Sequence, residues 1–196
     1  MADGAAQGVS VRLADAERDA ESVAAIYAPV VRETVISFEE LPPDADEMRR
    51  RMVRVLEWTP WLVAEAGGEV VGYAYAGRHR ERAAYRWSVD LSAYVAESWR
   101  SRGVGRTLYD RLLEVLRAQG FVNAYAGVTE PNPASIALHR AIGMQVIGTF
   151  ERVGWKFGGW HGVTWLGMRL WEPDGGPAEP LALPDLTWSG RWPSPP

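Results

Sequence analysis

Hydrophobic residues alternate with polar ones in some stretches of the chain and recur every three or four residues in others. The first pattern predicts strands and the second predicts amphipathic helices. Asp15 and Asp44 are good N-caps, and Pro29 lacks the N–H that a continuing helix needs, so we expect the first helix to end there. The predicted elements are a strand at 9–13, helices at 15–29 and 44–56, strands at 61–65, 70–75 and 85–95, a helix after residue 105 that ends near Gly120, a strand at 121–128, a helix at 132–143, and strands at 145–152 and 163–171.

The order of these elements predicts the fold class. Gly67-Gly68 between two apolar runs is typical of a tight hairpin turn. Strands and helices mix along the chain, which favours an α+β fold with a mixed sheet and helices on its faces. We expect a flexible N-terminus at 1–8, one domain at 9–172 and an irregular Pro- and Trp-rich tail at 173–196. Trp188 and Trp192 leave open whether this tail packs on the domain.

Composition narrows the classes of function. With 47% apolar residues, the 196-residue chain can fill a core, and the absence of cysteine excludes disulfides, thiolate metal sites and a cysteine nucleophile. Its three histidines are too scattered for a metal site, and a net charge of −4 argues against nucleic acid. The N-terminus lacks a basic and apolar leader, and no apolar run approaches the roughly 20 residues of a membrane span. We therefore expect a cytoplasmic protein without metal or membrane.

The most informative motif is the run from Arg100 to Gly105, which reads R-x-x-G-x-G between a predicted strand and a predicted helix. A glycine-rich turn that opens a helix presents free N–H groups and the positive end of the helix dipole to a phosphate. The Gly-Lys-Ser/Thr ending of a P-loop is absent, and so is the third glycine of a dinucleotide fingerprint. The motif by itself also fits an ordinary glycine-rich turn.

Together with its surroundings, the motif resembles the coenzyme A pyrophosphate loop of the GNAT acyltransferase superfamily. Within that superfamily, the chain is similar to phosphinothricin N-acetyltransferases and relatives that act on methionine sulfoximine or sulfone. The stretches that carry the resemblance are 34–35 with Phe38, 60–65, 74–77, 84–85, 92–95, 107–109, 118–121 and 158–161.

The resemblance implies a three-layer α/β/α fold around a mixed, mostly antiparallel twisted sheet, and a homodimer. It also implies acetyl-CoA as the cofactor, coenzyme A as a product and no metal. Asn132 with Pro133 also suits a helix N-terminus, so capping and cofactor contact can coexist there. The cofactor-binding residues implied are Tyr94, Val95, Arg100, Ser101, Arg102, Gly103, Val104, Gly105, Arg106, Thr107, Asn132 and Ser135.

Acetyl transfer to an amine needs a group that removes the amine's proton and a donor that assists the departing thiolate. Asp90 is the candidate base, directly or through one water, although the resembled family usually carries the longer Glu at this position. Asp is disfavoured in strands, so its presence here favours a functional role. The alternative is that Asp90 is only an outward-facing residue of the strand. His139 is the candidate for the thiolate by resemblance, and its alternative is a partly buried helix histidine.

The acceptor's carboxylate needs a cation, preferably an arginine that binds it through two nitrogens. Arg80 and Arg82 lie where the resembled family places basic residues for its substrate, and Phe38, Tyr75 and Tyr85 are expected to line the pocket. Residues 78–82 could instead form a solvated hairpin tip. Ten tryptophans are expected mainly in the core and at a subunit interface.

The leading hypothesis is an acetyl-CoA-dependent N-acetyltransferase for a small amino acid or analogue. A protein N-terminal or lysine acetyltransferase is the first alternative, but it needs an open groove rather than an arginine cluster for a free carboxylate. A non-catalytic acyl-CoA-sensing module is the second, and the Asp at position 90 keeps it open.

Overall fold

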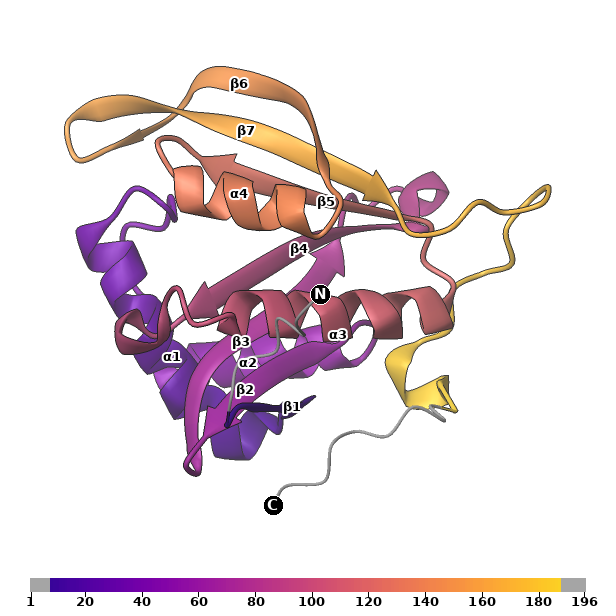
Figure 1. Cartoon of the computed structure of the whole chain (residues 1–196), viewed down its shortest axis with the longest axis horizontal. Coiled ribbons are helices and arrows are strands. Elements are labelled where there is room, and N and C mark those ends of the chain that lie inside the picture. The colour runs from indigo at the N-terminus through magenta and orange to yellow at the C-terminus, as the bar shows by residue number, and fades with distance from the viewer. Residues whose placement is uncertain (1–7, 188–196) are drawn as a thin grey trace.

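The computed structural model describes residues 8–187 and has a seven-stranded sheet at its centre (Figure 1). The sheet order is β1-β2-β3-β4-β5-β7-β6, and all neighbouring strands are antiparallel except β4 and β5. The strands are β1 (Ser10–Leu13), β2 (Trp61–Ala66), β3 (Glu69–Arg78), β4 (Ser88–Val95), β5 (Asn123–Thr129), β6 (Gln145–Lys156) and β7 (Gly159–Arg169).

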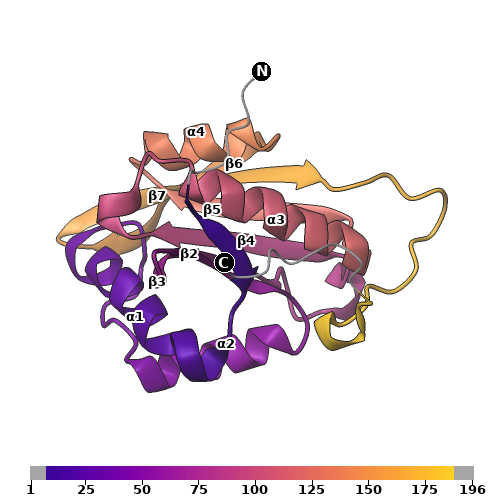
Figure 2. The same ribbon diagram turned by 60° about the horizontal axis from the view of Figure 1, so that its bottom comes forward.

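Helices cover both faces of this sheet and make the expected three layers (Figure 2). Helices α1 (Ala16–Glu33) and α2 (Ala45–Leu56) lie on one face, and α3 (Val104–Gln119) and α4 (Pro133–Ala141) lie on the other. The predicted order of elements and the predicted α+β class are confirmed.

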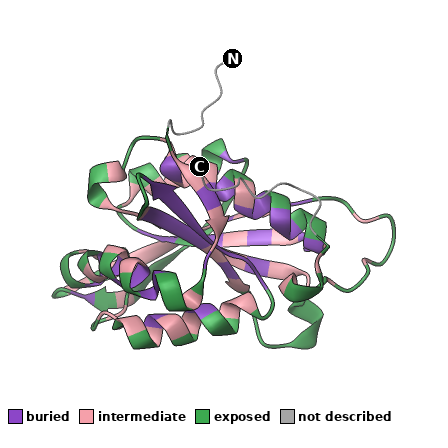
Figure 3. Cartoon of the chain, turned by 90° about the horizontal axis from the view of Figure 1, so that it is seen from below, coloured by how far each residue is buried: buried purple, intermediate pink, exposed green. Residues whose placement is uncertain are grey.

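The two faces of the sheet bury separate apolar clusters. Leu108, Leu112 and Leu116 of α3 are fully buried against one face, and Val23, Met48 and Met52 of α1 and α2 against the other. Buried residues therefore concentrate in the central strands and on the inner sides of the helices (Figure 3). Burial of this apolar area is the main stabilising contribution to the fold.

Two of the predicted boundaries that were wrong lie at Pro29 and Tyr85. Helix α1 continues past Pro29 to Glu33, because the next two residues, Val30 and Val31, are buried and their packing outweighs the lost helical hydrogen bond. The predicted strand at 85–95 begins only at Ser88, since residues 83–85 form a 3-10 turn in which Tyr85 N–H donates to the carbonyl of Arg82.

Strands β6 and β7 are also longer at their shared turn than the pattern predicted. A bulge between Phe150 and Gly154, with Arg152 at φ +52°, breaks the period-two alternation that a strand prediction depends on. The bulge also makes room for Phe38, whose ring lies where a Cβ on Gly154 would be. Lys156 fixes the turn by donating to the carbonyls of Val31 and Ser37, each at 2.7 Å.

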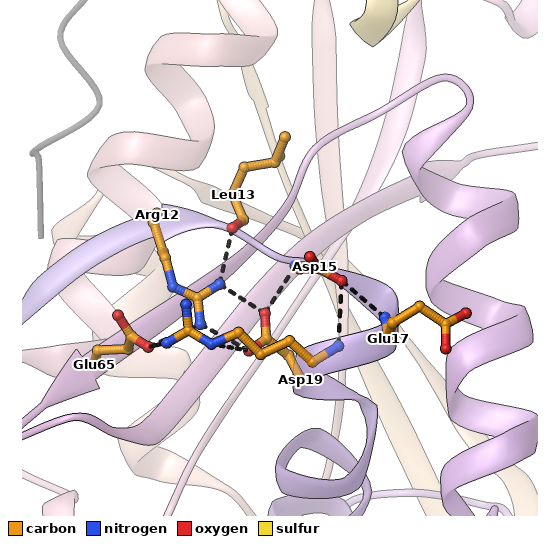
Figure 4. A network of polar contacts seen from close by, with 7 residues as sticks. Arg12, Leu13, Asp15, Glu17, Asp19 and Glu65 are labelled. Carbon is orange, nitrogen blue, oxygen red and sulfur yellow. Dashed lines mark hydrogen bonds and ion pairs between the residues drawn. The ribbon is translucent and has the colours of Figure 1, made fainter.

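A network of charged residues joins the N-terminal strand to the first helix (Figure 4). The guanidinium of Arg12 donates to both carboxylate oxygens of Asp19, at 2.6 and 2.7 Å, and to Glu65 on β2 at 2.8 Å. Asp15 caps α1 through the N–H groups of Glu17 and Arg18. The Arg12 guanidinium holds the pKa of the Glu65 carboxyl below its usual range. These pairs fix β1 against β2 at the sheet edge.

The tail beyond β7 folds back onto the domain as far as it is described. Leu181 N–H donates to the carbonyl of Gln119 at 2.8 Å, and Leu183 N–H to that of Trp58 at 3.1 Å. Trp188 and Trp192 lie outside the described residues. Trp61 is buried in the core, as expected for part of the tryptophans, whereas Trp155 and Trp160 are exposed in this single chain.

Candidate active site

Strands β4 and β5 separate halfway along their length. Their parallel pairing covers only three registers, and Asp90 with Tyr125 is the last of them. Strand β4 nevertheless runs on to Val95 and β5 to Thr129. Separated parallel strands expose backbone N–H and C=O groups that are available to an extended ligand. Asp90 therefore lies at the point where the gap between the strands begins.

A cavity of about 380 Å³ lies beside the end of β4 that extends beyond its pairing with β5. It collects residues from the end of β4, the loop before α3 and the first turns of α3 and α4. Of the predicted cofactor-binding residues, only Arg102 and Thr107 do not line this cavity. The ones that do are Tyr94, Val95, Arg100, Ser101, Gly103, Val104, Gly105, Arg106, Asn132 and Ser135.

The N-terminus of α3 points its backbone donors to this cavity's side of the fold. Gly103 caps the helix at φ +83°, a conformation that favours glycine, and no side chain caps it. The first helical hydrogen bond runs from Thr107 N–H to Gly103 C=O. The N–H groups of residues 104–106 thus have no acceptor within the helix, and the helix dipole adds positive potential. This arrangement suits an anionic phosphate.

The three arginines of the loop differ in their contacts. Arg106 binds Asp110 at 2.7 Å and the carbonyl of Ala141 at 2.9 Å, so its side chain joins α3 to α4. Arg102 is exposed, and its guanidinium stacks on Trp99 at 5.1 Å. Arg100 and Arg106 both line the cavity, but of these two only Arg100 has no ion pair among the described residues. Among these three, Arg100 is the cation best placed for a phosphate.

Helix α4 begins at the other side of the cavity and holds His139. The side chain of Asn132 caps this helix by accepting from Ser135 N–H at 3.1 Å. His139 is 4% exposed; its Nδ1 lies 2.7 Å from the carbonyl of Ser135, and its Nε2 lies 3.0 Å from the hydroxyl of Tyr109. Burial lowers the pKa of His139. Its ring reaches the cavity only through Ser135, whose hydroxyl is 3.3 Å from Nδ1.

Asp90 pairs with a histidine that sequence reasoning had not assigned to the site. Oδ1 of Asp90 lies 2.7 Å from Nδ1 of His79, which follows the end of β3. The Asp90 side chain is 31% exposed, and burial raises its pKa, although the bond to His79 and the positive charge of Arg80 oppose that rise. Only the register that pairs Gly77 with Asp90 brings the histidine and the carboxylate together.

The predicted acceptor residues do not share one cavity. Arg80, Arg82 and Tyr85 line a cavity of about 280 Å³ that also contains Glu179 of the tail. Tyr75 lines a separate aromatic cavity of about 310 Å³, which shares Tyr94 with the cofactor cavity and also contains Arg51 and Arg78. Phe38, 38% exposed, faces His161 at 6.5 Å and is not among the residues that line these cavities.

Arg80 is a predicted acceptor residue whose positive charge acts on Asp90. Its guanidinium lies 6.0 Å from the ring of Trp165 on β7, and that ring is 6.2 Å from His79. Within residues 8–187, no cluster of acidic and histidine side chains is arranged to hold a metal ion, and no helix is long and apolar enough to cross a bilayer.

Comparison with known proteins finds similar enzymes over most of the chain. Residues 13–165 match the model of the acetyltransferase (GNAT) domain. The chain is 37% identical to the phosphinothricin N-acetyltransferase of Streptomyces viridochromogenes, over 85% of this chain and 87% of that protein. It is also 37% identical to the L-methionine sulfoximine/L-methionine sulfone acetyltransferase of Pseudomonas aeruginosa, over 78% of this chain and 90% of that protein. The structure of a GNAT superfamily phosphinothricin acetyltransferase from Sinorhizobium meliloti in complex with acetyl-CoA superposes on this chain with a TM-score of 0.82. The two sequences are 34% identical, and the superposition covers 91% of this chain and 97% of that one.

Proposed function

This chain belongs to the GNAT acetyltransferase family, and we propose that it moves an acetyl group from acetyl-CoA to the amino group of a small amino-acid-like acceptor. Phosphinothricin, methionine sulfoximine and methionine sulfone are the model acceptors, because relatives at 37% identity carry those names. The observation that carries the proposal is the cavity at the N-terminus of α3, which collects ten of the twelve predicted cofactor residues, since Arg102 and Thr107 alone lie outside it.

Acetyl-CoA fits this cavity by its chemistry. Its pyrophosphate would be held by the free N–H groups of residues 104–106 and by Arg100, and its pantetheine arm by the end of β4 near Val95, with Asn132 and Ser135 opposite. The bound cofactor supplies the acetyl group as a thioester. Coenzyme A leaves as a product, and no metal is needed.

Asp90 is the proposed base, and His139 is the proposed group that assists the thiolate. Asp90 removes the proton of the acceptor's ammonium group, directly or through one water, because it lies where β4 and β5 separate. His139 assists the departing thiolate. Because His139 is buried, its contribution passes through the hydroxyl of Ser135, which lines the cofactor cavity.

The acceptor's carboxylate is assigned to Arg80, with Arg82 beside it. The amino and carboxylate groups of an α-amino acid are only two bonds apart, so the cation that binds the carboxylate must lie close to the base. Arg80 meets this condition, since its charge acts on Asp90. Phe38, Tyr75 and Tyr85 are proposed to contact the rest of the acceptor.

We further propose a homodimer that forms through the β6–β7 hairpin. This hairpin lies at the edge of the sheet (Figure 1) and exposes apolar side chains that a monomer would not be expected to leave in water. The exposed side chains are Val146, Ile147, Phe150, Val153, Trp155, Phe157 and Trp160. A cytoplasmic location is proposed as well, because the chain has no cysteine that would need an oxidising compartment.

An assay of thiol release from acetyl-CoA tests the proposed function. The panel contains phosphinothricin, methionine sulfoximine, methionine sulfone, ordinary amino acids, their amides, and a peptide with a free N-terminal alanine. We expect turnover with the free amino acids and weak turnover with the amides and the peptide. Preference for the peptide would instead indicate a protein acetyltransferase. Tight binding of acetyl-CoA without any turnover would indicate a sensing module.

A further inference from the structure

His79 is held in the geometry of a histidine that acts as a base. Its Nδ1 lies 2.7 Å from Oδ1 of Asp90, and because a carboxylate accepts, Nδ1–H is the donor. In the neutral imidazole Nε2 then carries no proton, and it has no hydrogen-bond partner among residues 8–187. A carboxylate that orients an imidazole and leaves its other nitrogen free is the arrangement that activates histidine in many enzymes.

The ring of His79 also lies at the position that the reaction requires. It is bonded to Asp90 on β4, and its centroid is 4.7 Å from that of Tyr125 on β5. Asp90 and Tyr125 form the last paired register before the strands separate. His79 therefore bridges both strands at the inner end of the gap, where the cofactor's acetyl group is expected under the proposed function.

Building on that proposed function, we infer that His79, oriented by Asp90, is the group that takes the proton from the acceptor amine. Asp90 then acts through His79 as a positioning residue. This assignment also accounts for an aspartate where the resembled family usually has the longer glutamate. Because the Asp90 carboxylate is shorter, its reach toward the acceptor is restored by the imidazole bonded to it.

The protons balance in this scheme. The acceptor's ammonium gives one proton to Nε2 of His79, and its freed lone pair forms the new C–N bond. When the C–S bond breaks, the acceptor's nitrogen gives up its second proton. The thiolate receives this proton through the solvent or through the Ser135–His139 contact. His79 finally returns the first proton to water. The sum is an amide, a free thiol and one released proton.

Few charged groups face the imidazole. Asp90 contacts it from β4, Arg80 follows it in the chain, Tyr85 of the 3-10 turn lies 5.8 Å away and Tyr125 of β5 lies 4.7 Å away, measured between rings. Trp165 of β7, at 6.2 Å, is uncharged. Apart from Asp90, the side chains that contact the ring are aromatic.

The test compares two substitutions of His79. His79→Asn keeps an amide donor close to the position of Nδ1, so Asp90 stays bonded, but it removes the nitrogen that accepts the proton. We expect kcat to fall by about 10²–10⁴-fold with an unchanged Kd for acetyl-CoA, and the acid limb of the kcat/KM profile to disappear. Arg111→Ala, which removes a side chain of α3 that pairs with Glu114, is the control and should retain its kcat.

His79→Ala provides an independent readout, because free imidazole added to the assay should restore turnover in proportion to its unprotonated fraction. A merely structural histidine would not show this rescue. Wild-type-like kcat and an unchanged acid limb in His79→Asn, with an active wild type, would overturn the assignment and leave the acetyltransferase function intact. A wild type that releases no thiol with any acceptor would overturn the proposed function and this assignment together.

Discussion

Gly105 and Leu138 face each other closely where α3 packs on α4. A Cβ built on Gly105 would lie 3.0 Å from Cδ2 of Leu138 and 3.9 Å from Cγ2 of Val95. The two glycines of the loop therefore have different reasons to be glycine. Gly103 needs its positive φ, whereas Gly105 allows a close approach between helices at the back of the cofactor cavity.

The first prediction concerns this contact. In Gly105→Val, the added side chain meets Leu138 and displaces the first turn of α3, which misaligns the N–H groups that we assign to the pyrophosphate. We expect the Kd for acetyl-CoA to rise at least about tenfold, or about 1.4 kcal/mol, by calorimetric titration. Gly176→Val, in open space in the tail, is the control. Unchanged binding in a folded Gly105→Val protein would refute the assignment.

A second prediction separates Arg80 and Arg82 from the cofactor site. Loss of a charge-assisted hydrogen bond typically costs about 1.5–3 kcal/mol, so Arg80→Ala should lower kcat/KM for free amino acids roughly ten- to a hundredfold. The loss should be absent with amino acid amides and smaller in Arg82→Ala, because Arg80 is the arginine whose charge acts on Asp90. Arg111→Ala, on the exposed side of α3, is the control. Equal losses on acids and amides would argue against carboxylate recognition.

The third prediction concerns Asp90. Asp90→Asn should reduce kcat by about 10²–10⁴-fold, with acetyl-CoA affinity near normal, because the amide cannot stabilise a protonated imidazole. Asp90→Glu keeps the carboxylate and should retain far more activity. Because burial raises the pKa of Asp90, the carboxylate loses its charge as the pH falls through a range above its ordinary value. The acid limb should therefore change in Asp90→Asn, and an unaltered limb with near-wild-type turnover would make Asp90 structural.

A fourth prediction follows from the buried state of His139. Its pKa is lowered by burial, so below the ordinary histidine value of about 6.5 the unfolded chain binds a proton that the folded protein does not. Stability should therefore fall as the pH drops below that value, by at most about 1.4 kcal/mol per pH unit for one proton. Urea unfolding between pH 7 and 5 should show that the free energy of unfolding changes less with pH in His139→Gln than in the wild type. NMR titration of wild-type His139 should give a pKa below the ordinary value, and a higher one would contradict the prediction.

The same variant separates the two roles of His139. If the residue assists the thiolate through Ser135, His139→Gln should lower kcat while the KM for acetyl-CoA changes little. If it only joins α3 to α4 through Tyr109, stability should fall and kcat per folded molecule should stay near that of the wild type. Folded fractions measured by circular dichroism normalise the comparison.

The fifth prediction tests the proposed homodimer. Trp155→Arg on β6 should raise the dimer's Kd by more than about thirtyfold, because a central interface aromatic typically contributes 2 kcal/mol or more. Leu41→Arg changes an apolar residue that is 82% exposed in the loop before α2, and it should leave the Kd unchanged. Analytical ultracentrifugation distinguishes the two results. A monomeric wild type at all concentrations would exclude the dimer.

The sequence by itself determined the order of the elements, the class of the fold and the loop that opens α3. These depend on local rules, since the period of apolar residues, the caps at Asp15 and Asp44 and the glycines at 67 and 68 each act within a few residues. Local rules failed where packing overrode them, as at Pro29, or where a bulge broke the alternation, as between Phe150 and Gly154.

Only the tertiary structure decided which side chains meet. His79 and Asp90 are eleven residues apart, and their contact depends on the register of β3 against β4, which alternation alone does not specify. The division of the predicted acceptor residues between separate cavities likewise depends on how α2 and the tail pack on the sheet. Contacts between distant segments are set by the sum of many packing interactions, so a single local motif does not encode them.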